Sequence, residues 1–489
     1  MFSTPKNQAN ILIKNAQVYD GYSAHSSVYD VAIINDKIVA TGQLSTWDGD
    51  EIIDATGLEL TPGFIDVHTH DDLEVIRNPK MLNKLSQGVT TVIVGNCGIS
   101  ASPFNLNGTP PDPINLLGQQ SEFLYSDFSQ YVNAVNNVKP AVNVAALIGH
   151  TSLRVEAMDD LNRSANEQEL KAMSCKLKIA MQQGAKGLSS GLAYTNAKAA
   201  KSDELKILAS QITPFKGLYT THLRTEFNEI IDALDESFQI ARKAKVELII
   251  SHLKCAGKNN WGRAKEILAH IEQASITQPI SFDSYPYSAS SSTLDLEQVN
   301  NDSDIFISWS TPYPELAGQT LEKIAIFWKI PLLEAAKRLQ PAGAVYHCMD
   351  EMDVQSILSS TKGMIGSDGL PCDPHPHPRL WGCFPRVLRK YVRELHLFSL
   401  NTAIRKMTGL SAKQFKISKR GMIRVGYFAD LVLFDSQRIT DRADYLNPIE
   451  TSEGIIKVWV NGKLSYQEEH LSPPPATPLT RAGCFLLHE

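Results

Sequence analysis

The stretch Thr61-Pro-Gly-Phe-Ile-Asp-Val-His-Thr-His-Asp-Asp72 decides how the rest of the chain is interpreted. A Pro-Gly pair introduces a short apolar run over residues 64–67, which predicts a buried strand. His68 and His70 follow at its end, and alternate residues of a strand point to the same face. Because imidazole is the commonest metal ligand, the pair suits a metal ion. A polar strand end in a turn is the alternative for an isolated His-x-His.

Composition narrows the class of protein. The chain has 489 residues, enough for a large core and more than one domain. Hydrophobic residues make up 43% and charged residues 20%, as in soluble globular proteins. A net charge of −6 gives no reason to expect a nucleic acid or an anionic membrane as partner. We expect neither a secretory signal nor a membrane span, and the scattered cysteines predict a cytoplasmic protein with reduced thiols.

The two ends of the chain predict one small β domain. Residues 10–60 contain short runs of alternating apolar and polar residues separated by turn signals, a pattern typical of an antiparallel sheet. This unit is too small to close a core alone, and a similar pattern returns over 429–463. We therefore expect residues 1–61 and 416–489 to fold together as a β-sandwich, with the Pro-rich tail from Ser472 as an extended arm.

Between the ends, apolar runs recur, and each finishes in polar residues. These candidate strands lie within 61–72, 91–97, 144–150, 184–190, 218–222, 248–252, 280–285 and 364–368. Helical patterns separate many of them, most clearly over 227–244, which has one apolar stripe. Alternating strands and helices predict an α/β fold with a parallel sheet, and eight units fit a (β/α)8 barrel over residues 62–415. The long gap at 287–361 predicts an insertion that acts as a lid.

Side chains suited to zinc follow the ends of these runs. They are His68, His70, Cys97, His222, His252 and Asp368. In a barrel, the carboxyl ends of the strands gather at one face, where the chemistry takes place. The alternative is that loops are simply polar, but this predicts Ser, Asn, Asp and Gly rather than a set rich in His and Cys. A catalytic zinc lowers the pKa of its water, and Asp368 could carry the proton to a leaving amine.

Several motifs resemble the N-acyl-D-amino-acid deacylases, or D-aminoacylases, of the amidohydrolase superfamily. Besides 61–72, they are Gly95-Asn-Cys-Gly98, Thr221-His-Leu-Arg224, Ser251-His-Leu-Lys-Cys-Ala-Gly257, Gly366-Ser-Asp-Gly-Leu-Pro371 and Asp373-Pro-His-Pro-His-Pro-Arg-Leu-Trp-Gly382. The resemblance extends over nearly the whole chain, although the C-terminal tail matches poorly. It implies zinc-dependent hydrolysis of a small N-acyl-D-amino acid to a carboxylate and a free D-amino acid.

The resemblance also implies a role for each site residue. Cys97, His222 and His252 would hold a tightly bound zinc, while His68, His70 and Asp368 would line a second metal position that is weak or empty, and that Cys97 could bridge. Asp368 would be the general base. The substrate carboxylate would be bound by Lys254, Tyr285, Arg379 and, as a weaker candidate, Ser291. Arginine binds a carboxylate in a bidentate manner, lysine adds a point charge and tyrosine donates its hydroxyl. Ordinary surface charge is the alternative for the lysine and the arginine.

Other polar residues near the motifs have weaker assignments. We expect structural support from His150, a rigid loop around His375 and His377, and simple packing from Cys255, Cys372 and Cys383. Lys186 stands where the family usually has an apolar residue. It could pack toward the helices, or it could be a carbamylated lysine that bridges two metals.

Two further functions stay open at this point. The first is a cyclic amidase resembling hydantoinases or dihydroorotases, which Cys97 and the Arg379 loop disfavour. The second is an inactive scaffold, which the complete set of ligand types disfavours. The sequence leaves open the accepted side chain and acyl group, the number of metals and the oligomeric state, and the preference for D substrates rests on the resemblance alone.

Overall fold

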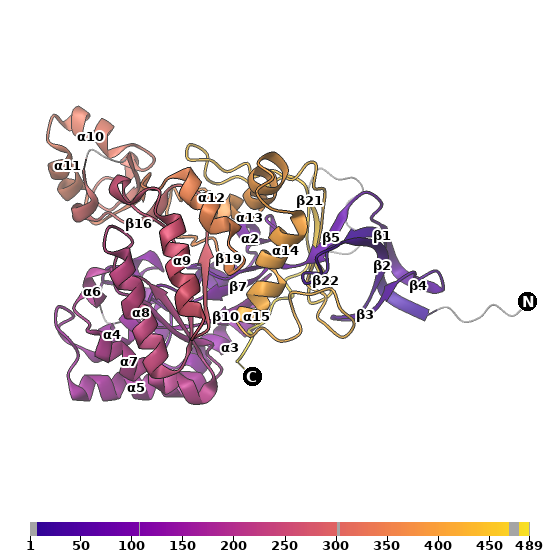
Figure 1. Ribbon diagram of the computed structural model, residues 1–489, viewed down its shortest axis with the longest axis horizontal. Helices are drawn as coiled ribbons and strands as arrows, with labels where there is room; N and C mark the ends of the chain where they lie inside the picture. Colours follow the sequence, from indigo (N-terminus) through magenta and orange to yellow (C-terminus); the bar gives the residue numbers. More distant parts are fainter. Residues whose placement is uncertain (1–6, 107, 301–303, 469–478, 489) are drawn as a thin grey trace, which may run out of the picture.

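The computed structural model describes residues 7–106, 108–300, 304–468 and 479–488, and it has an α/β fold (Figure 1). Two parallel sheets form its centre. The first contains β6 (Phe64–Asp66), β7 (Val89–Val94) and β10 (Asn143–Ala146), in the order β10-β7-β6. The second contains, in order, β11 (Ile148–Gly149), β12 (Gly187–Gly191), β13 (Leu218–His222), β14 (Glu247–Ile250), β15 (Ile280–Ser284) and β19 (Gly363–Ile365).

The two parallel sheets lie next to each other and are connected at both edges. Strands β10 and β11 are separated by Leu147, whose amide donates to the carbonyl of Val94 at 2.9 Å. At the other edge, Thr69 forms a parallel bridge with Gly369 just after β6 and β19. The strands therefore lie in the order expected from the sequence. The backbone hydrogen bonds divide these strands between two sheets. They show neighbouring parallel sheets and not a closed eight-stranded barrel.

Helices connect the parallel strands, as the alternating pattern predicts. The longer ones are α3 (Phe128–Val138), α4 (His150–Ala157), α5 (Glu167–Gln182), α7 (Ser202–Ile212), α8 (Ile230–Ala244), α9 (Ala264–Ser275), α12 (Glu351–Ser359), α13 (Arg379–Arg386) and α14 (Leu400–Met407). The apolar stripe expected over 227–244 is the buried face of α8, where Ile230, Leu234 and Phe238 pack into the core. This helix ends at Ala244, and the next residue, Lys245, adopts a left-handed conformation with a φ of 56°.

Strands from both ends of the chain share one further sheet. It contains β1 (Asn7–Val18), β2 (Ser27–Ile34), β3 (Lys37–Gly42), β4 (Trp47–Asp54), β5 (Glu59–Pro62), β20 (Leu431–Phe434), β21 (Ile455–Val460) and β22 (Lys463–Gln467). The N-terminal and C-terminal parts meet where β5 pairs antiparallel with β20. This joint sheet confirms that the two ends fold together. The pairings record a single sheet, whereas a sandwich would need two sheets that face each other.

Most of the segment 287–361, up to the end of β18, forms a small unit of its own. It contains β16 (Ser290–Thr293), β17 (Ile305–Ser310), β18 (Ala342–Tyr346), α10 (Leu321–Trp328) and α11 (Leu332–Leu339), with β18 in the middle of a three-stranded sheet. Figure 1 shows α10 and α11 at one end of the molecule and the strands β1–β4 at the other. No helix of the described part of the chain is long and apolar enough to cross a membrane.

The predicted arm from Ser472 starts outside the described residues. Its described part, 479–488, lies against the central sheets, where Phe485 forms a parallel bridge with Val144. The Phe485 ring also packs edge-on against Phe128 and Tyr131, at centroid distances of 5.7 and 5.9 Å. The end of the chain is therefore held by the core of the molecule.

Candidate metal centre

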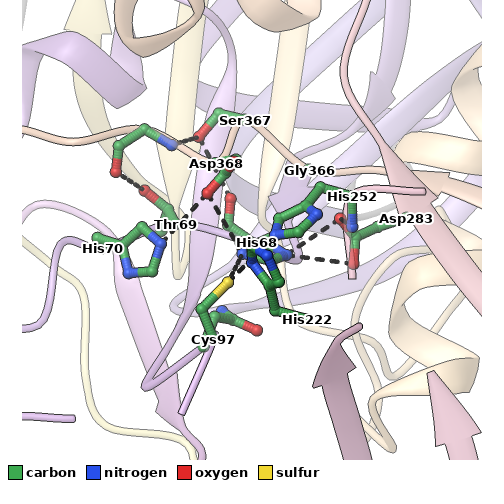
Figure 2. Close-up of polar contacts among 12 residues, drawn as sticks. His68, Thr69, His70, Cys97, His222, His252, Asp283, Gly366, Ser367 and Asp368 are labelled. Atoms are coloured by element: carbon green, nitrogen blue, oxygen red, sulfur yellow. Dashed lines mark hydrogen bonds and ion pairs between the residues drawn. The ribbon is translucent and has the colours of Figure 1, made fainter. Parts of the chain in front are cut away.

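The polar residues that follow the parallel strands converge at one point (Figure 2). His68 and His70 come just after β6, Cys97 after β7 and Asp368 after β19. His222 is the last residue of β13, and His252 follows β14. Because parallel strands end on the same side of a sheet, residues separated by up to 300 positions lie within contact distance.

Four of these side chains form one tight group. His68, Cys97, His252 and Asp368 each offer a ligand atom, and these atoms all lie within 4.8 Å of one another. The Cys97 Sγ atom is 3.2 Å from His68 Nε2 and 3.3 Å from His252 Nε2. Asp368 Oδ1 lies 3.4 Å from His68 Nε2. Ligands of a tetrahedral zinc stand about 3.5 Å apart, so the spacing suits a shared ion.

His222 and His70 flank this group on different sides. The His222 ring lies edge-on to the His252 ring at a centroid distance of 4.4 Å, and His222, Glu226 and His252 form a second candidate group. His70 Nε2 is 3.2 Å from Asp368 Oδ1. The structure therefore brings all six expected ligands together. Five of them belong to two groups of candidate ligands that have His252 in common. His70 is linked to the first group by its contact with Asp368.

The backbone is unusual at three of these residues. Cys97, His252 and Asp368 have φ values of 52°, 34° and 49°, in the left-handed region that residues other than glycine rarely adopt. Such conformations cost about 1–3 kcal/mol each and concentrate at functional sites. The strand ends are therefore turned at the points where they present their side chains to the centre.

The charges of the group favour the ligand form of the thiol. Burial raises the pKa of Cys97, but His68 and His252 outweigh this effect and hold that pKa well below its ordinary value. Burial also raises the pKa of Asp368, and Arg379 together with His252 and His68 lowers it well below the usual range. These directions favour a thiolate and a carboxylate, which are the forms in which both groups bind zinc.

Two carboxylates that the sequence analysis did not single out hold the histidines in place. Asp283, in β15, accepts a hydrogen bond from the His252 amide at 2.9 Å and lies 3.1 Å from His68 Nδ1. Glu226 Oε1 lies 2.9 Å from His252 Nδ1. The signal for Asp283 was its place at the end of a predicted strand. Glu226 lies four residues after His222 in the loop before α8, where no periodic pattern marks it.

The expected substrate residues lie beside the centre. Lys254 Nζ is 2.6 Å from Glu226 Oε1, and Arg379 Nη1 is 2.9 Å from Asp368 Oδ2. The Arg379 guanidinium also lies over the Tyr285 ring, 4.6 Å from its centroid. The hydroxyl groups of Tyr285 and Ser291 are buried without a hydrogen-bond partner among the described residues. Buried, unpaired donors next to two cations suit an anionic ligand.

The weaker candidates lie outside the ligand group. His150 Nε2 is 2.8 Å from Glu204, which also pairs with the buried Arg154. His375 and His377 contact backbone carbonyl groups. Cys255 and Cys383 are buried, and Cys372 is half-buried against the Leu117 carbonyl. Lys186 precedes β12 at its amino end, and its ammonium group donates to the carbonyls of Lys416 and Leu487 at 3.2 and 3.1 Å.

Comparisons with known proteins agree with this arrangement. The model of the amidohydrolase family matches residues 51–279 and 332–466. An N-acyl-D-aspartate deacylase of Alcaligenes xylosoxydans xylosoxydans is 44% identical over 463 residues, which cover 94% of this chain and 93% of that protein.

Two proteins of known structure are similar over their full length. Crystal structures of D-aminoacylase, studied for its binuclear metal centre, have a TM-score of 0.94 and 42% identity, with 98% of this chain and 100% of the other covered. The N-acyl-D-glutamate deacylase of Bordetella bronchiseptica, solved with zinc and a phosphonate that mimics the tetrahedral intermediate, has a TM-score of 0.93 and 39% identity, with coverages of 99% and 100%.

Proposed function

This chain belongs to the amidohydrolase family, among the N-acyl-D-amino-acid deacylases, and we propose that it hydrolyses N-acyl-D-amino acids with zinc as cofactor. The products are a carboxylate and a free D-amino acid. The convergence of Cys97, His252, His68 and Asp368 within 4.8 Å is the observation that carries this proposal. The cyclic amidase and scaffold alternatives lose support, because the full-length relatives act on linear N-acyl amino acids by name.

The ligand side chains suit zinc, with one site of high affinity. Cys97, His222 and His252 would hold it, and His68, His70 and Asp368 would line a second, weaker position. The thiolate of Cys97 supports this assignment, because a deprotonated sulfur is a strong zinc ligand. When bound, zinc supplies a water of lowered pKa and polarises the amide carbonyl.

The protein's own side chains would perform the remaining steps. Asp368 is held as a carboxylate by Arg379 and faces the centre through Oδ1, so it can accept the proton of the attacking water. It can later return this proton to the nitrogen of the leaving amine. Lys254, Tyr285, Ser291 and Arg379 would bind the substrate carboxylate. Two of them are cations, and the hydroxyl groups of the other two have no hydrogen-bond partner in the described part of the chain.

The same comparisons support a finer description of the fold. We propose that the two parallel sheets belong to one (β/α)8 barrel over residues 62–415, because the strands lie in sequence order and the outer pair meets at Thr69 and Gly369. Residues 1–61 and 416–489 would form the β-sandwich domain, and 287–361 the lid. A cytoplasmic location is also proposed, supported by the free state of all seven cysteines.

The Asp368→Asn variant tests the catalytic part of this proposal. We expect turnover of N-acetyl-D-methionine to fall by about 100-fold or more while bound zinc is retained, because the amide can no longer take up the proton. Zinc content and activity should be measured on the same sample, with Asp160→Asn, an exposed loop substitution, as control. An active Asp368→Asn enzyme would refute the role. Turnover of hydantoin in place of any N-acetyl amino acid, D or L, would refute the function.

A further inference from the structure

A fully buried lysine lies beside the candidate metal centre, and the sequence analysis did not single it out. The Nζ atom of Lys84 is 2.8 Å from Asp66 Oδ2 and 3.0 Å from Asp71 Oδ2. It also donates hydrogen bonds to the hydroxyl groups of Thr69 at 2.9 Å and Ser367 at 3.1 Å. Each of these four partners lies within two positions of an expected metal ligand in the chain.

The charges around Lys84 keep it protonated. Burial lowers the pKa of this side chain, but Asp66 and Asp71 outweigh that effect and raise the pKa above its ordinary value. Removing a lysine from water is costly unless opposite charges and hydrogen bonds compensate for the loss. Here two carboxylates and two hydroxyl groups do so, and they connect the stretch after β6 to the loop that carries Asp368.

Ser367 links this group to Asp368, which is the next residue in the chain (Figure 2). Its amide donates to Asp66 Oδ1 at 2.8 Å, and its hydroxyl donates to Asp66 Oδ2 at 2.6 Å. The same hydroxyl oxygen accepts hydrogen bonds from Lys84 and, at 3.1 Å, from the Gly369 amide. One carboxylate and one hydroxyl group therefore fix the backbone on both sides of Asp368.

The backbone at Asp368 needs such support, because its φ of 49° lies in the left-handed region. A residue in this region pays about 1–3 kcal/mol and stays there only when its surroundings impose the conformation. The Asp368 amide donates to the His68 carbonyl at 2.6 Å, and the His70 amide donates to the Gly369 carbonyl at 3.0 Å. Without the Ser367 hydroxyl, the turn would lose a restraint, and the carboxylate that follows it would move.

We propose that Lys84, Asp66 and Ser367 are positioning residues that hold the carboxylate of Asp368 in place for proton transfer. This inference rests on the proposed function, in which Asp368 accepts the proton of the attacking water. Lys84 balances the charge of Asp66, Asp66 holds Ser367, and Ser367 fixes the turn. The side chains of Asp66 and Ser367 contact the backbone of His68, through its amide and its carbonyl group. They therefore act on the position of the chain.

Ser367→Ala is the primary test, because it removes the hydroxyl group and leaves Lys84 paired with Asp66. For the N-acetyl-D-amino acid that the wild-type enzyme cleaves fastest, we expect kcat to fall by about tenfold or more, since a misplacement of about 1 Å can cost about 100-fold. KM should stay within about threefold, because the residues proposed to bind the substrate are intact. Zinc content should be unchanged.

Ser237→Ala is the matched control for this variant. It also removes a buried hydroxyl group, which donates to the Ala233 carbonyl at 2.9 Å within α8. The kcat of this control should stay within about twofold of the wild-type value. A loss of kcat smaller than about tenfold in Ser367→Ala, or an equal loss in the control, would overturn the inference.

Combining Ser367→Ala with Asp368→Asn separates positioning from a general loss of structure. If Ser367 acts through Asp368, its removal should change the residual kcat of Asp368→Asn by less than about twofold, because residues that act as a unit are not additive. The quantity to compare is kcat per bound zinc. If the two losses multiply instead, Ser367 acts by another route and the inference fails.

Lys84→Met tests the other end of the group. It leaves Asp66 and Asp71 buried without their cation, which costs about 3–5 kcal/mol, so unfolding in denaturant must be measured with the kinetics. We expect the folded variant to lose kcat and keep its zinc, as Ser367→Ala does. A folded Lys84→Met enzyme with the wild-type kcat would remove the lysine from the group. If this variant does not fold, Ser367→Ala and the double variant still decide the inference.

The results also separate this inference from the proposed function. If the zinc-loaded wild-type enzyme cleaves no N-acetyl-D-amino acid, the proposed function fails. If Asp368→Asn keeps full activity, the role of Asp368 as general base fails. If Asp368→Asn is impaired but Ser367→Ala is not, only the positioning role fails.

Discussion

At the scale of single residues, the centre depends on partners that hold the ligands in position. Glu226 is buried, and its Oε1 atom lies within 2.9 Å of both His252 Nδ1 and Lys254 Nζ. Burial raises the pKa of this carboxyl group, but Lys254 and the histidines outweigh it and hold the pKa well below its ordinary value. One carboxylate therefore orients a candidate zinc ligand and a candidate substrate residue together.

Replacing Glu226 by Gln should weaken both functions. We expect zinc affinity to fall by about 10- to 100-fold, as is typical when the partner of a metal ligand is changed, and KM to rise because Lys254 loses its ion pair. Competition with a chelator measures the first effect and steady-state kinetics the second. Glu236→Gln is the control, since it also breaks an ion pair, with Arg224, but does not contact the ligands. Unchanged zinc affinity would show that Glu226 only packs.

At the scale of elements, the end of the chain is attached to the amino side of the sheets. The amide of Leu486 donates to Val144 in β10, and the amide of His488 donates to Gly184 just before β12. Lys186 completes this attachment through the carbonyl groups of Lys416 and Leu487. Because Lys186 lies at the amino end of its strand, it faces away from the side on which the ligands gather.

This position predicts a structural role for Lys186 rather than a metal-bridging one. Lys186→Met should lower the free energy of unfolding by about 1–3 kcal/mol, since two partly buried carbonyl groups lose their donor, while zinc content stays unchanged. Denaturant unfolding and metal analysis of the same preparation measure both effects. Lys171→Met, on the exposed face of α5, should change neither. A loss of half the metal would support the carbamylated lysine.

At the scale of the whole molecule, the joint sheet and the parallel sheets share one hydrophobic core. Val432 and Phe434 of β20 and Val458 of β21 belong to the same buried cluster as Phe64 of β6 and Val92 of β7. The proposed domains are therefore not independent in their packing. Separating them would expose apolar surface that costs about 25 cal/mol for each Å².

We expect a polypeptide of residues 62–415 alone to lack a cooperative fold. It would leave the shared core open, and it would also lack the segment 483–488 that lies against β10. Circular dichroism during heating and zinc binding should be compared with those of the full chain. A sharp thermal transition together with bound zinc in the shorter polypeptide would show that the barrel is stable without the chain ends.

The sequence by itself determined the family, the α/β class and the identity of the side chains that meet at the centre. It could do so because metal ligands follow short buried strands, and because strand and helix periods are local properties of the chain. That the two ends of the chain fold together was also predictable, since the N-terminal β unit is too small to close a core alone.

Only the tertiary structure decided which groups support those ligands. No sequence pattern marks Glu226, and Asp283 is marked only by its place at the end of a predicted strand. Their roles follow from distances to His252 that are set by the packing of β13, β14 and β15. The left-handed turns at Cys97, His252 and Asp368 have no sequence signal either. Such features arise from contacts between distant residues, which local sequence preferences do not encode.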